Sequence, residues 1–229
     1  MKAVVLMAGA GKRMATYYEG PKQLLPVNGK PVVEYLLDQL VSHVDGFVFV
    51  VGGPNERLIQ EHFASGEYKG VPITFVRQEE QLGLAHAFRT ARDHLSGRWI
   101  GSVGDDIFGE GDLSLLIEAD GSAVLAYHVP NPENFGVLVT DDAGNLLKAV
   151  EKPKEFVSDL VWAGAMVMDE DFFAVEVAPS ARGEYETPDV WTKLIQERGK
   201  KIKVVRGSLW LPVNDKAQLD EAERILRSM

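Results

Sequence analysis

A glycine-bearing loop with basic residues at its end is the first segment whose residue types could bind a ligand. The residues AGAGKRM, numbered 8–14, directly follow a compact apolar run at residues 2–7. Small residues at such a turn let backbone N–H groups approach phosphate oxygens closely, which suits a nucleotide. The loop is not a Walker loop, nor a complete GxGxxG, because Met14 stands at the last glycine position. On these residues alone, a purely structural turn is the alternative.

Basic residues near the N-terminus could serve the same ligand. Lys12, Arg13, Lys22 and Lys30 lie close together in the sequence, although the formal net charge of the chain is -10. An acidic surface field repels polyanions, so we expect no nucleic-acid partner, whereas a local site for a small anion is allowed. A solvated basic patch is the alternative interpretation of these charges.

Length and composition predict one folded enzyme-sized domain. The 229 residues include 45% hydrophobic and 25% charged residues, the balance of an ordinary globular protein. The absence of cysteine excludes disulfides, a thiol nucleophile and cysteine zinc sites. The N-terminal apolar run is too short for a signal peptide, and no run of about 18 apolar residues suggests a membrane span. We therefore expect a cytoplasmic protein without a membrane partner.

Alternating strands and helices must position the glycine-bearing loop. Apolar runs predict strands, and helical spacing predicts the helices between them. The expected strands are residues 2–7, 47–51, 73–76 and 99–103, and the expected helices are residues 31–43, 55–64 and 83–95. Such a βαβ series forms a parallel sheet covered on both faces, with ligands beyond the carboxyl ends of its strands. Motifs that directly follow strands therefore carry the most weight.

The pattern changes after about residue 122. Closely spaced strands are expected at residues 123–127, 135–140, 146–150 and 165–168, followed by helices at 190–196 and 218–226 with a strand at 203–206. The predicted fold class is α/β: a single Rossmann-like domain, residues 1–229, with a mixed, mainly parallel sheet flanked by helices and additional β-structure. We expect residues 1–121 to form mainly the nucleotide-binding half, and residues 122–229 the other half.

Longer strings of the sequence resemble a known family. VVLMAGAGKRM, residues 4–14, followed by PKQLLPVNGKPVVEY from Pro21, is similar to the signature of the sugar-1-phosphate nucleotidylyltransferases. The resemblance implies that Arg13 contacts a nucleoside triphosphate and that Lys22 neutralises charge at the reacting phosphates. Ala8, Gly9 and Gly11 would bind the nucleotide. The family's usual threonine is Lys12 here, and residues 15–20 lack its common Pro-Leu-Thr.

Two further strings resemble the family's base-reading and metal-binding segments. The residues QEEQLGLAHA from Gln78 imply that Gln78 reads the base and that Gly83 allows its close approach. The string VGDDIF from Val103 implies Asp105 as a ligand of Mg²⁺, which prefers oxygen donors. WLPVND from Trp210 implies Asn214 as the second ligand. Asp215 is the alternative, as a ligand or as a helix N-cap.

The remaining matches fall on the sugar side. NFGVL from Asn134, VEKP from Val150 and GEYETPD from Gly183 resemble the family's sugar-site segments. They imply that Gly136, Glu151 and Lys152 bind the sugar phosphate, with Gly164 and Glu186 as further substrate-binding residues. Trp162 stands where N-acetylglucosamine uridylyltransferases tend to carry asparagine.

The expected function is transfer of a nucleoside monophosphate from a nucleoside triphosphate, UTP or dTTP, to a sugar 1-phosphate, with release of pyrophosphate and with Mg²⁺ as cofactor. One alternative is a CTP-dependent cytidylyltransferase for phosphocholine or a related alcohol phosphate. Another, of a different class, is a noncatalytic nucleotide- or sugar-sensing relative, because a fold resemblance supports activity less than it supports fold. The resemblance also allows a homo-oligomer.

Overall fold

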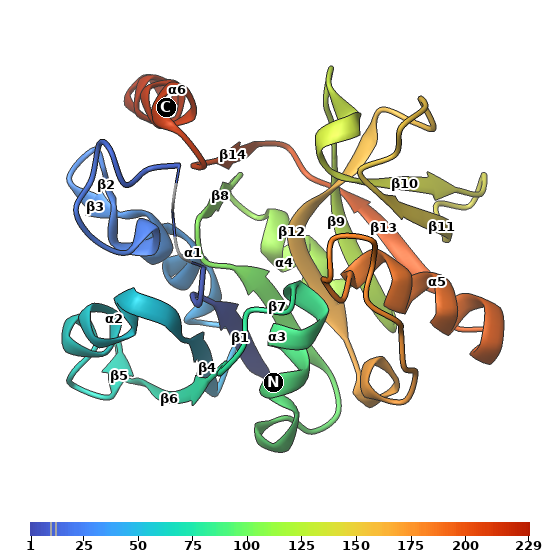
Figure 1. The fold of residues 1–229 in the computed structure, drawn as a ribbon, viewed down its shortest axis with the longest axis horizontal. Coiled ribbons are helices and arrows are strands. Elements are labelled where there is room, and N and C mark those ends of the chain that lie inside the picture. Colours follow the sequence, from blue (N-terminus) through green and yellow to red (C-terminus); the bar gives the residue numbers. More distant parts are fainter. Residues whose placement is uncertain (10, 12) are drawn as a thin grey trace.

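Four parallel strands form the sheet of the N-terminal half. The computed structural model describes residues 1–9, 11 and 13–229. The strands β1 (Lys2–Leu6), β4 (Gly46–Val51), β6 (Val71–Arg77) and β7 (Trp99–Val103) pair in parallel in the order β7-β1-β4-β6. Their carboxyl ends therefore meet at one edge of the sheet, as the βαβ pattern predicts (Figure 1).

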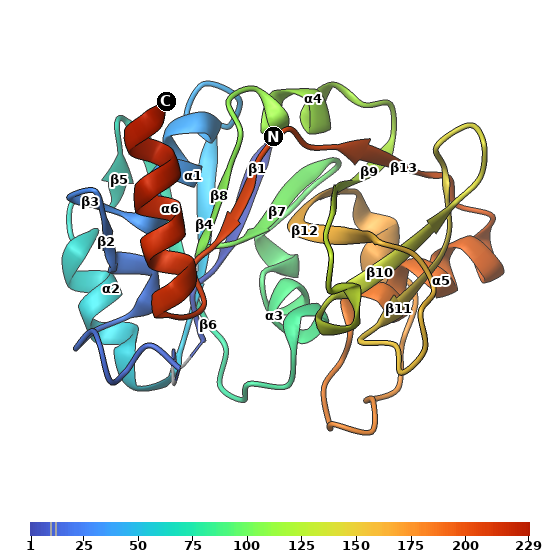
Figure 2. The ribbon, with the colours of Figure 1, turned by 90° about the horizontal axis from the view of Figure 1, so that it is seen from above.

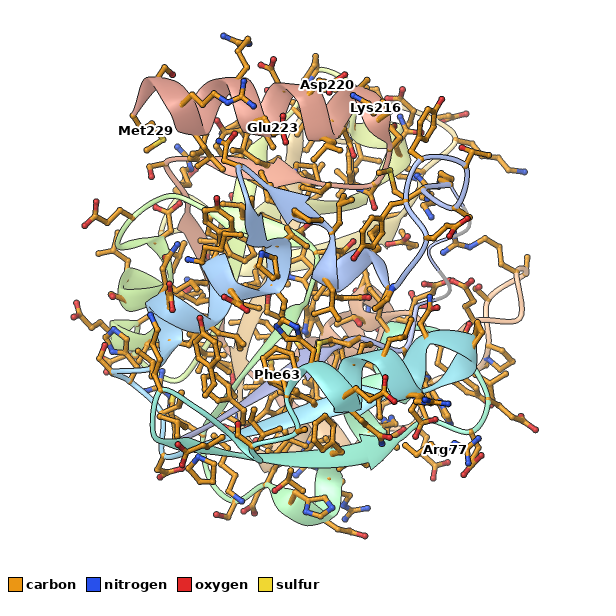
Figure 3. All side chains as sticks on the ribbon, turned by 90° about the vertical axis from the view of Figure 1, so that its left-hand side faces the viewer. Phe63, Arg77, Lys216, Asp220, Glu223 and Met229 are labelled. Carbon is orange, nitrogen blue, oxygen red and sulfur yellow. The ribbon has the colours of Figure 1, made fainter. Side chains whose placement is uncertain are left out.

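Helices cover both faces of the central strands β1 and β4, which explains why these strands are almost entirely apolar. Side chains alternate across a strand, so Ala3 and Val5 of β1 lie in one core with residues of α1 (Val32–Leu40) and α2 (Glu56–His62). Val4 and Leu6 lie in another core with Phe88 of α3 (Leu84–Thr90). In Figure 3, Phe63 lies beside α2. Its ring meets the ring of Phe49 of β4 edge-on, with 5.0 Å between the ring centroids.

The second half extends the same sheet. The long strand β12 (Leu160–Met168) pairs antiparallel with β7 and continues the sheet to β10 (Gly136–Thr140) and β11 (Leu146–Glu151). The strands β9 (Ser122–His128) and β13 (Ile202–Arg206) branch from β12 and pair in parallel with each other. Ten strands thus join the two halves, seen on either side of β7 and β12 in Figure 2.

Helices also cover the second half. α5 (Thr187–Arg198) packs on β11, and α4 (Asp112–Glu118) packs near β9. The last helix, α6 (Lys216–Ser228), lies beside the two-residue strands β2 (Pro26–Val27) and β3 (Lys30–Pro31) (Figure 2). Figure 3 labels Lys216, Asp220 and Glu223 along this helix. Among the described residues, no helix is both long enough and apolar enough to cross a membrane.

The mixed α/β fold class and the series of strands and helices are confirmed, and the differences are local. The helix expected at residues 31–43 begins at Val32, because Pro31 has an extended backbone and pairs with Pro26. The helix expected at 83–95 ends at Thr90 and is followed by a separate turn of 3-10 helix at Arg92–His94. The helix α4 was not among the expected helices.

Short strands were missed as well. The strands β5 (Glu67–Tyr68), β8 (Asp106–Phe108) and β14 (Trp210–Pro212) contain two or three residues each, too few for an alternating pattern. β8 and β14 pair antiparallel, with Asp106 opposite Pro212, although they are about half the chain apart in sequence. This pairing brings two of the predicted site segments together.

Candidate functional site

Two cavities adjoin at the carboxyl ends of the parallel strands. The first has a volume of about 310 Å³ and lies over the ends of β1, β6 and β7. The second, of about 690 Å³, lies between β8, β10, β11, β12 and the segment before α6. Leu84, Val103 and Asp105 line both cavities, so Asp105 stands at their junction. Two substrates bound in these cavities would meet beside this carboxylate.

All five predicted nucleotide-binding residues line the first cavity: Ala8, Gly9, Gly11, Gln78 and Gly83. Gly11 has a φ of +60°, a left-handed conformation that favours glycine, and its hydrogen faces Lys22. Ala10 and Lys12, which belong to the same predicted loop, lie outside the described residues. The structure therefore brings the loop after β1 and the segment after β6 around one space.

Gln78 is held in the wall of the first cavity. It follows β6 directly, its backbone N–H donates to Val51 O at 2.8 Å, and the residue is only 4% exposed. Its Nε2 lies 2.9 Å from His86 Nδ1 and 3.5 Å from Gly83 O. Gly83 has a φ of +98°, and a Cβ there would lie 2.7 Å from Tyr185 O, so only glycine fits this turn.

One ammonium group joins the two predicted metal ligands. Lys22 Nζ donates to Asn214 Oδ1 at 2.9 Å and forms an ion pair with Asp105 Oδ2. The Lys22 and Asp105 side chains are each 14% exposed, so the pair is largely shielded from water. A carboxylate oxygen and an amide oxygen thus converge on a single cation at the junction of the cavities.

The pairing of β8 with β14 explains this convergence. Asp105 precedes β8, and its carbonyl accepts a hydrogen bond of 3.1 Å from the backbone N–H of Val213, which follows β14. Gln218 Oε1 accepts from the Asn214 backbone N–H at 2.8 Å. Asp215 instead caps α6, because its Oδ1 accepts from Gln218 N at 2.9 Å. Of the two neighbours, Asn214 faces Asp105.

Asp106 is a buried carboxyl group that the sequence did not single out. Its exposed fraction is 4%, and it lines the second cavity with Trp210 and Gly164. Burial raises the pKa of Asp106 well above its ordinary value, and the neighbouring charge of Asp105 adds to this effect. The paired letters Asp-Asp indicated acidic chemistry, but not which of the two would be buried.

The second cavity gathers the predicted sugar-side residues. Gly136, Glu151, Lys152 and Gly164 line it, and so does Arg13. Gly136 of β10 is opposite Glu151 of β11, and a Cβ at Gly136 would lie 3.1 Å from Glu151 Oε2. Arg13 was expected beside the triphosphate; it is exposed and lies in the wall of the second cavity.

Burial raises the pKa of the Glu151 carboxyl, although two cations oppose this effect. Lys152 Nζ lies 3.6 Å from Glu151 Oε1, and Arg182 Nη2 lies 3.3 Å from the same oxygen. Glu186 adds a second negative charge nearby, which also raises the pKa of Glu151. The guanidinium group of Arg182 therefore lies between the carboxylates of Glu151 and Glu186.

Glu186 does not line either cavity among the described residues. Its carboxylate is 7% exposed as a side chain and accepts from Ser180 Oγ at 2.7 Å and from Arg182 Nη2 at 2.8 Å. It also occupies the N-cap position of α5. Glu186 therefore holds Arg182 beside Glu151 in this structure. Glu184, two residues earlier, lines the first cavity instead.

Several lining residues were missed by sequence reasoning. Gln81, Leu84 and Glu184 line the first cavity, and Asn131, Trp210 and Gln218 line the second. Gln81 and Glu184 lie inside strings that the sequence did indicate, QEEQLGLAHA and GEYETPD, so membership of these strings was an available signal. Lys30 belongs elsewhere: its ammonium bonds to Asp38 Oδ2 at 2.6 Å.

A magnesium ion would find few protein ligands here. No group of three or more His, Cys, Asp or Glu side chains suited to a metal exists among residues 1–9, 11 and 13–229. Mg²⁺ commonly takes only one or two protein oxygens, with water and substrate phosphates completing its shell. The Asp105 and Asn214 oxygens, which already share a cation, fit that donor set.

Comparison with known proteins agrees with this arrangement. The family model described as nucleotidyl transferase matches residues 2–227. The chain is 38% identical to the UTP–glucose-1-phosphate uridylyltransferase AglF of Haloferax volcanii, over 99% of this chain and 97% of the relative. It is 35% identical to the bifunctional protein GlmU of Methanococcus maripaludis, over 92% of this chain. The chain covers only 50% of GlmU, about half its length.

Solved structures give the same fold. A Bacillus anthracis protein described as a glucose-1-phosphate thymidylyltransferase superposes with a TM-score of 0.85 at 26% identity, covering 100% of this chain and 96% of that one. A UDP-glucose pyrophosphorylase bound to UDP-glucose superposes with a TM-score of 0.86 at 21% identity, covering 99% and 98%. With a family model that spans nearly the whole chain, the protein belongs to the nucleotidyl transferase family.

Proposed function

We propose that the protein transfers a nucleoside monophosphate from UTP or dTTP to a sugar 1-phosphate, releasing pyrophosphate and forming a nucleoside-diphosphate sugar. The observation that carries the proposal is the junction of the two cavities, where Lys22, Asp105 and Asn214 meet. The first cavity would take the nucleotide and the second the sugar phosphate. Family membership and the glucose-1-phosphate enzymes among its relatives support this choice over cytidylyl transfer to phosphocholine.

Asp105 and Asn214 would hold Mg²⁺, and the shared Lys22 ammonium supports this proposal because it shows both oxygens facing one cation. When bound, the metal would supply positive charge to the phosphates and act as a Lewis acid. Lys22 would then turn from Asp105 toward the phosphates, where its charge helps to neutralise the triphosphate.

The protein's task is to align two phosphates and to offset their charge. A nonbridging oxygen of the sugar phosphate forms a bond to the α-phosphorus, while the bond from that phosphorus to the oxygen that bridges the α- and β-phosphates breaks, and this oxygen leaves with pyrophosphate. The attacking oxygen is already anionic near neutral pH, so no general base is required. Lys152 and Arg13 line the cavity of the sugar phosphate, so they would hold this anion in position for the attack.

The position of the cavities supports a division of labour along the chain. Residues 1–121 provide the loop after β1, Gln78 and Gly83, and residues 122–229 provide Gly136, Glu151, Lys152, Gly164 and Asn214. We therefore propose nucleotide binding mainly by the first half and sugar-phosphate binding mainly by the second. A cytoplasmic location, where nucleoside triphosphates are made, and assembly into a homo-oligomer are proposed with this function.

The direct test is pyrophosphate release in the presence of Mg²⁺, with each nucleoside triphosphate paired with a panel of sugar 1-phosphates and with phosphocholine. Turnover that requires UTP or dTTP and one sugar 1-phosphate is the expected result. Turnover only with CTP and phosphocholine would reject the proposal. Binding of nucleotide without turnover for any pair would favour the sensing alternative.

A pair of variants tests the role of the metal ligands. Asp105→Ala should abolish magnesium-dependent turnover and leave the folded structure intact. Asp120→Ala, which removes an exposed carboxylate that is not among the residues lining either cavity, is the matched control. Unchanged turnover in Asp105→Ala would reject the role of this carboxylate.

A further inference from the structure

The side-chain amide of Gln78 has a defined orientation in the first cavity. Gly83 O can only accept a hydrogen bond, so the Gln78 atom that lies 3.5 Å from it must be the NH₂ group. The reversed amide would place two oxygen atoms against each other at this point. The same Nε2 lies 2.9 Å from His86 Nδ1, which must then be the acceptor, with the ring proton on Nε2.

The oxygen atom of this amide, Gln78 Oε1, faces the first cavity. Among the described residues, no group donates a hydrogen bond to Gln78 Oε1, and this oxygen is not among the fully buried side-chain atoms that lack a partner. Gln78 itself lines the first cavity. The amide therefore presents an acceptor to a ligand there, while both of its hydrogens are used by Gly83 and His86.

Contacts with Tyr185 hold the ring of His86 in place beside Gln78. His86 lies in α3, two residues after the helix begins, and its ring stacks on Tyr185 with 6.2 Å between ring centroids and 30° between planes. The backbone of Tyr185 is in turn tied to residues beside His86, since Ala85 N–H donates to Tyr185 O at 3.1 Å and Tyr185 N–H donates to Leu82 O at 2.7 Å. The His86 lone pair is thus held in place against Gln78.

We infer that His86 is a positioning residue that selects the pyrimidine base by fixing the orientation of Gln78. This inference rests on the proposed function. Uracil and thymine carry a ring N–H between two carbonyls, and Gln78 Oε1 would accept from it. Cytosine has an unprotonated ring nitrogen at the same place, so two acceptors would oppose each other. The arrangement therefore favours UTP or dTTP over CTP without any contact between His86 and the base.

The test compares substitutions that keep, remove or reverse the acceptor. His86→Asn retains an acceptor oxygen on the same branch as Nδ1, whereas His86→Leu removes it and His86→Lys offers only donors. We expect the ratio of kcat/KM for UTP to that for CTP to fall about tenfold or more in His86→Leu, and further in His86→Lys. His86→Asn should stay within about threefold of the wild type.

Two controls separate this role from a structural one. His94→Leu makes the same substitution at an exposed histidine, and it should leave the ratio unchanged. In a Gln78→Leu background, His86→Leu should have no further effect on the ratio, because the amide that it orients is gone. Thermal unfolding of each variant shows whether it folds.

Binding of UDP and CDP, measured by calorimetry without any sugar phosphate, tests the inference apart from the chemistry. If the wild type binds UDP in preference to CDP and His86→Leu reduces this preference, the inference stands even where no sugar 1-phosphate reacts. If His86→Leu weakened the binding of UDP and CDP by the same factor, the inference would be overturned. An unchanged ratio in His86→Leu and His86→Lys, or a wild-type preference for CDP, would also overturn it.

Discussion

Lys22 donates a hydrogen bond of 2.9 Å to the Oδ1 atom of Asn214, 192 positions away in the chain. The same ammonium pairs with Asp105, so a side chain of the protein occupies the place where the proposed metal would bind. Removing either oxygen would leave the ammonium with fewer partners, which is costly because its charge is largely shielded from water. The relationship links the start of the chain, the end of β7 and the start of α6 in one contact.

The two neighbours Asn214 and Asp215 should separate activity from stability. Asn214→Ala removes an oxygen beside Asp105, and we expect the Mg²⁺ concentration for half-maximal turnover to rise about tenfold or more. Asp215→Ala removes the N-cap of α6, and it should lower the free energy of unfolding by about 1 kcal/mol with turnover retained. Magnesium titrations of turnover and urea unfolding of both variants check this. The reverse pattern would make Asp215 the ligand.

This pair also shows what the sequence could and could not predict. The string WLPVND placed a metal ligand near residue 214, but an isolated asparagine before a helix equally suggests a cap. Only the three-residue pairing of β8 with β14 decides that Asp215 caps the helix and Asn214 faces Asp105. Strands of this length have no periodicity to detect.

The long elements were predictable because each buries a continuous or periodic apolar face. β1 after Lys2 and the whole of β4 have no polar side chain, since both of their faces meet helices. The positions of Gly83 and Gly136 could be predicted because each requires glycine. The backbone of Tyr185 lies too close to Gly83 for a Cβ, and the carboxylate of Glu151 lies too close to Gly136. The burial of Asp106 and the ion pairs of Arg182 depend on packing between distant segments, and nothing local in the sequence encodes them.

Glu151 should make stability fall as pH rises. Burial holds the pKa of this carboxyl above its ordinary value of 4.5, so the folded state keeps its proton to a higher pH than the unfolded chain. The contribution of the protonated carboxyl to stability is fully present below pH 4.5 and is lost as the pH rises through the pKa of the folded state. The free energy of unfolding of Glu151→Gln, relative to wild type, should therefore increase with pH across this window. Urea unfolding at several pH values measures it, and a constant difference would contradict the expectation.

Asp38 should show the opposite dependence. Burial alone would raise its pKa, but hydrogen bonds from Lys30, Lys69 and Tyr68 outweigh it and lower the pKa from 3.8 to about 2. Its contribution is therefore present above pH 3.8 and is lost as pH falls through about 2. Because the side chain is 30% exposed, we expect Asp38→Asn to cost only about 1 kcal/mol at neutral pH.

Titration of the Asp38 carboxyl by NMR measures this pKa directly, and urea unfolding of Asp38→Asn measures the free-energy cost. The cost should shrink as the pH is lowered from 7 toward 3. Asp142→Asn, at an exposed aspartate in a turn, serves as the control. A cost in Asp38→Asn that grows toward acid would show that the three hydrogen bonds do not favour the charged form.

Gly164 should be intolerant of a methyl group for a reason that Gly144 does not share. Both glycines have left-handed backbones, with φ of +79° and +74°, so an alanine at either position should cost about 1 kcal/mol of strain. A Cβ at Gly144 meets nothing within 4 Å, whereas one at Gly164 would lie 2.3 Å from Asp106 Oδ2 and 2.8 Å from Val103 Cγ2. We expect Gly164→Ala to lower the free energy of unfolding, measured with urea, by about 1–3 kcal/mol more than Gly144→Ala does. It should also raise the KM for the sugar 1-phosphate, because Asp106 and Gly164 share the wall of the second cavity. Equal costs in the two variants would mean that Asp106 moves aside freely and that its burial is not fixed by this contact.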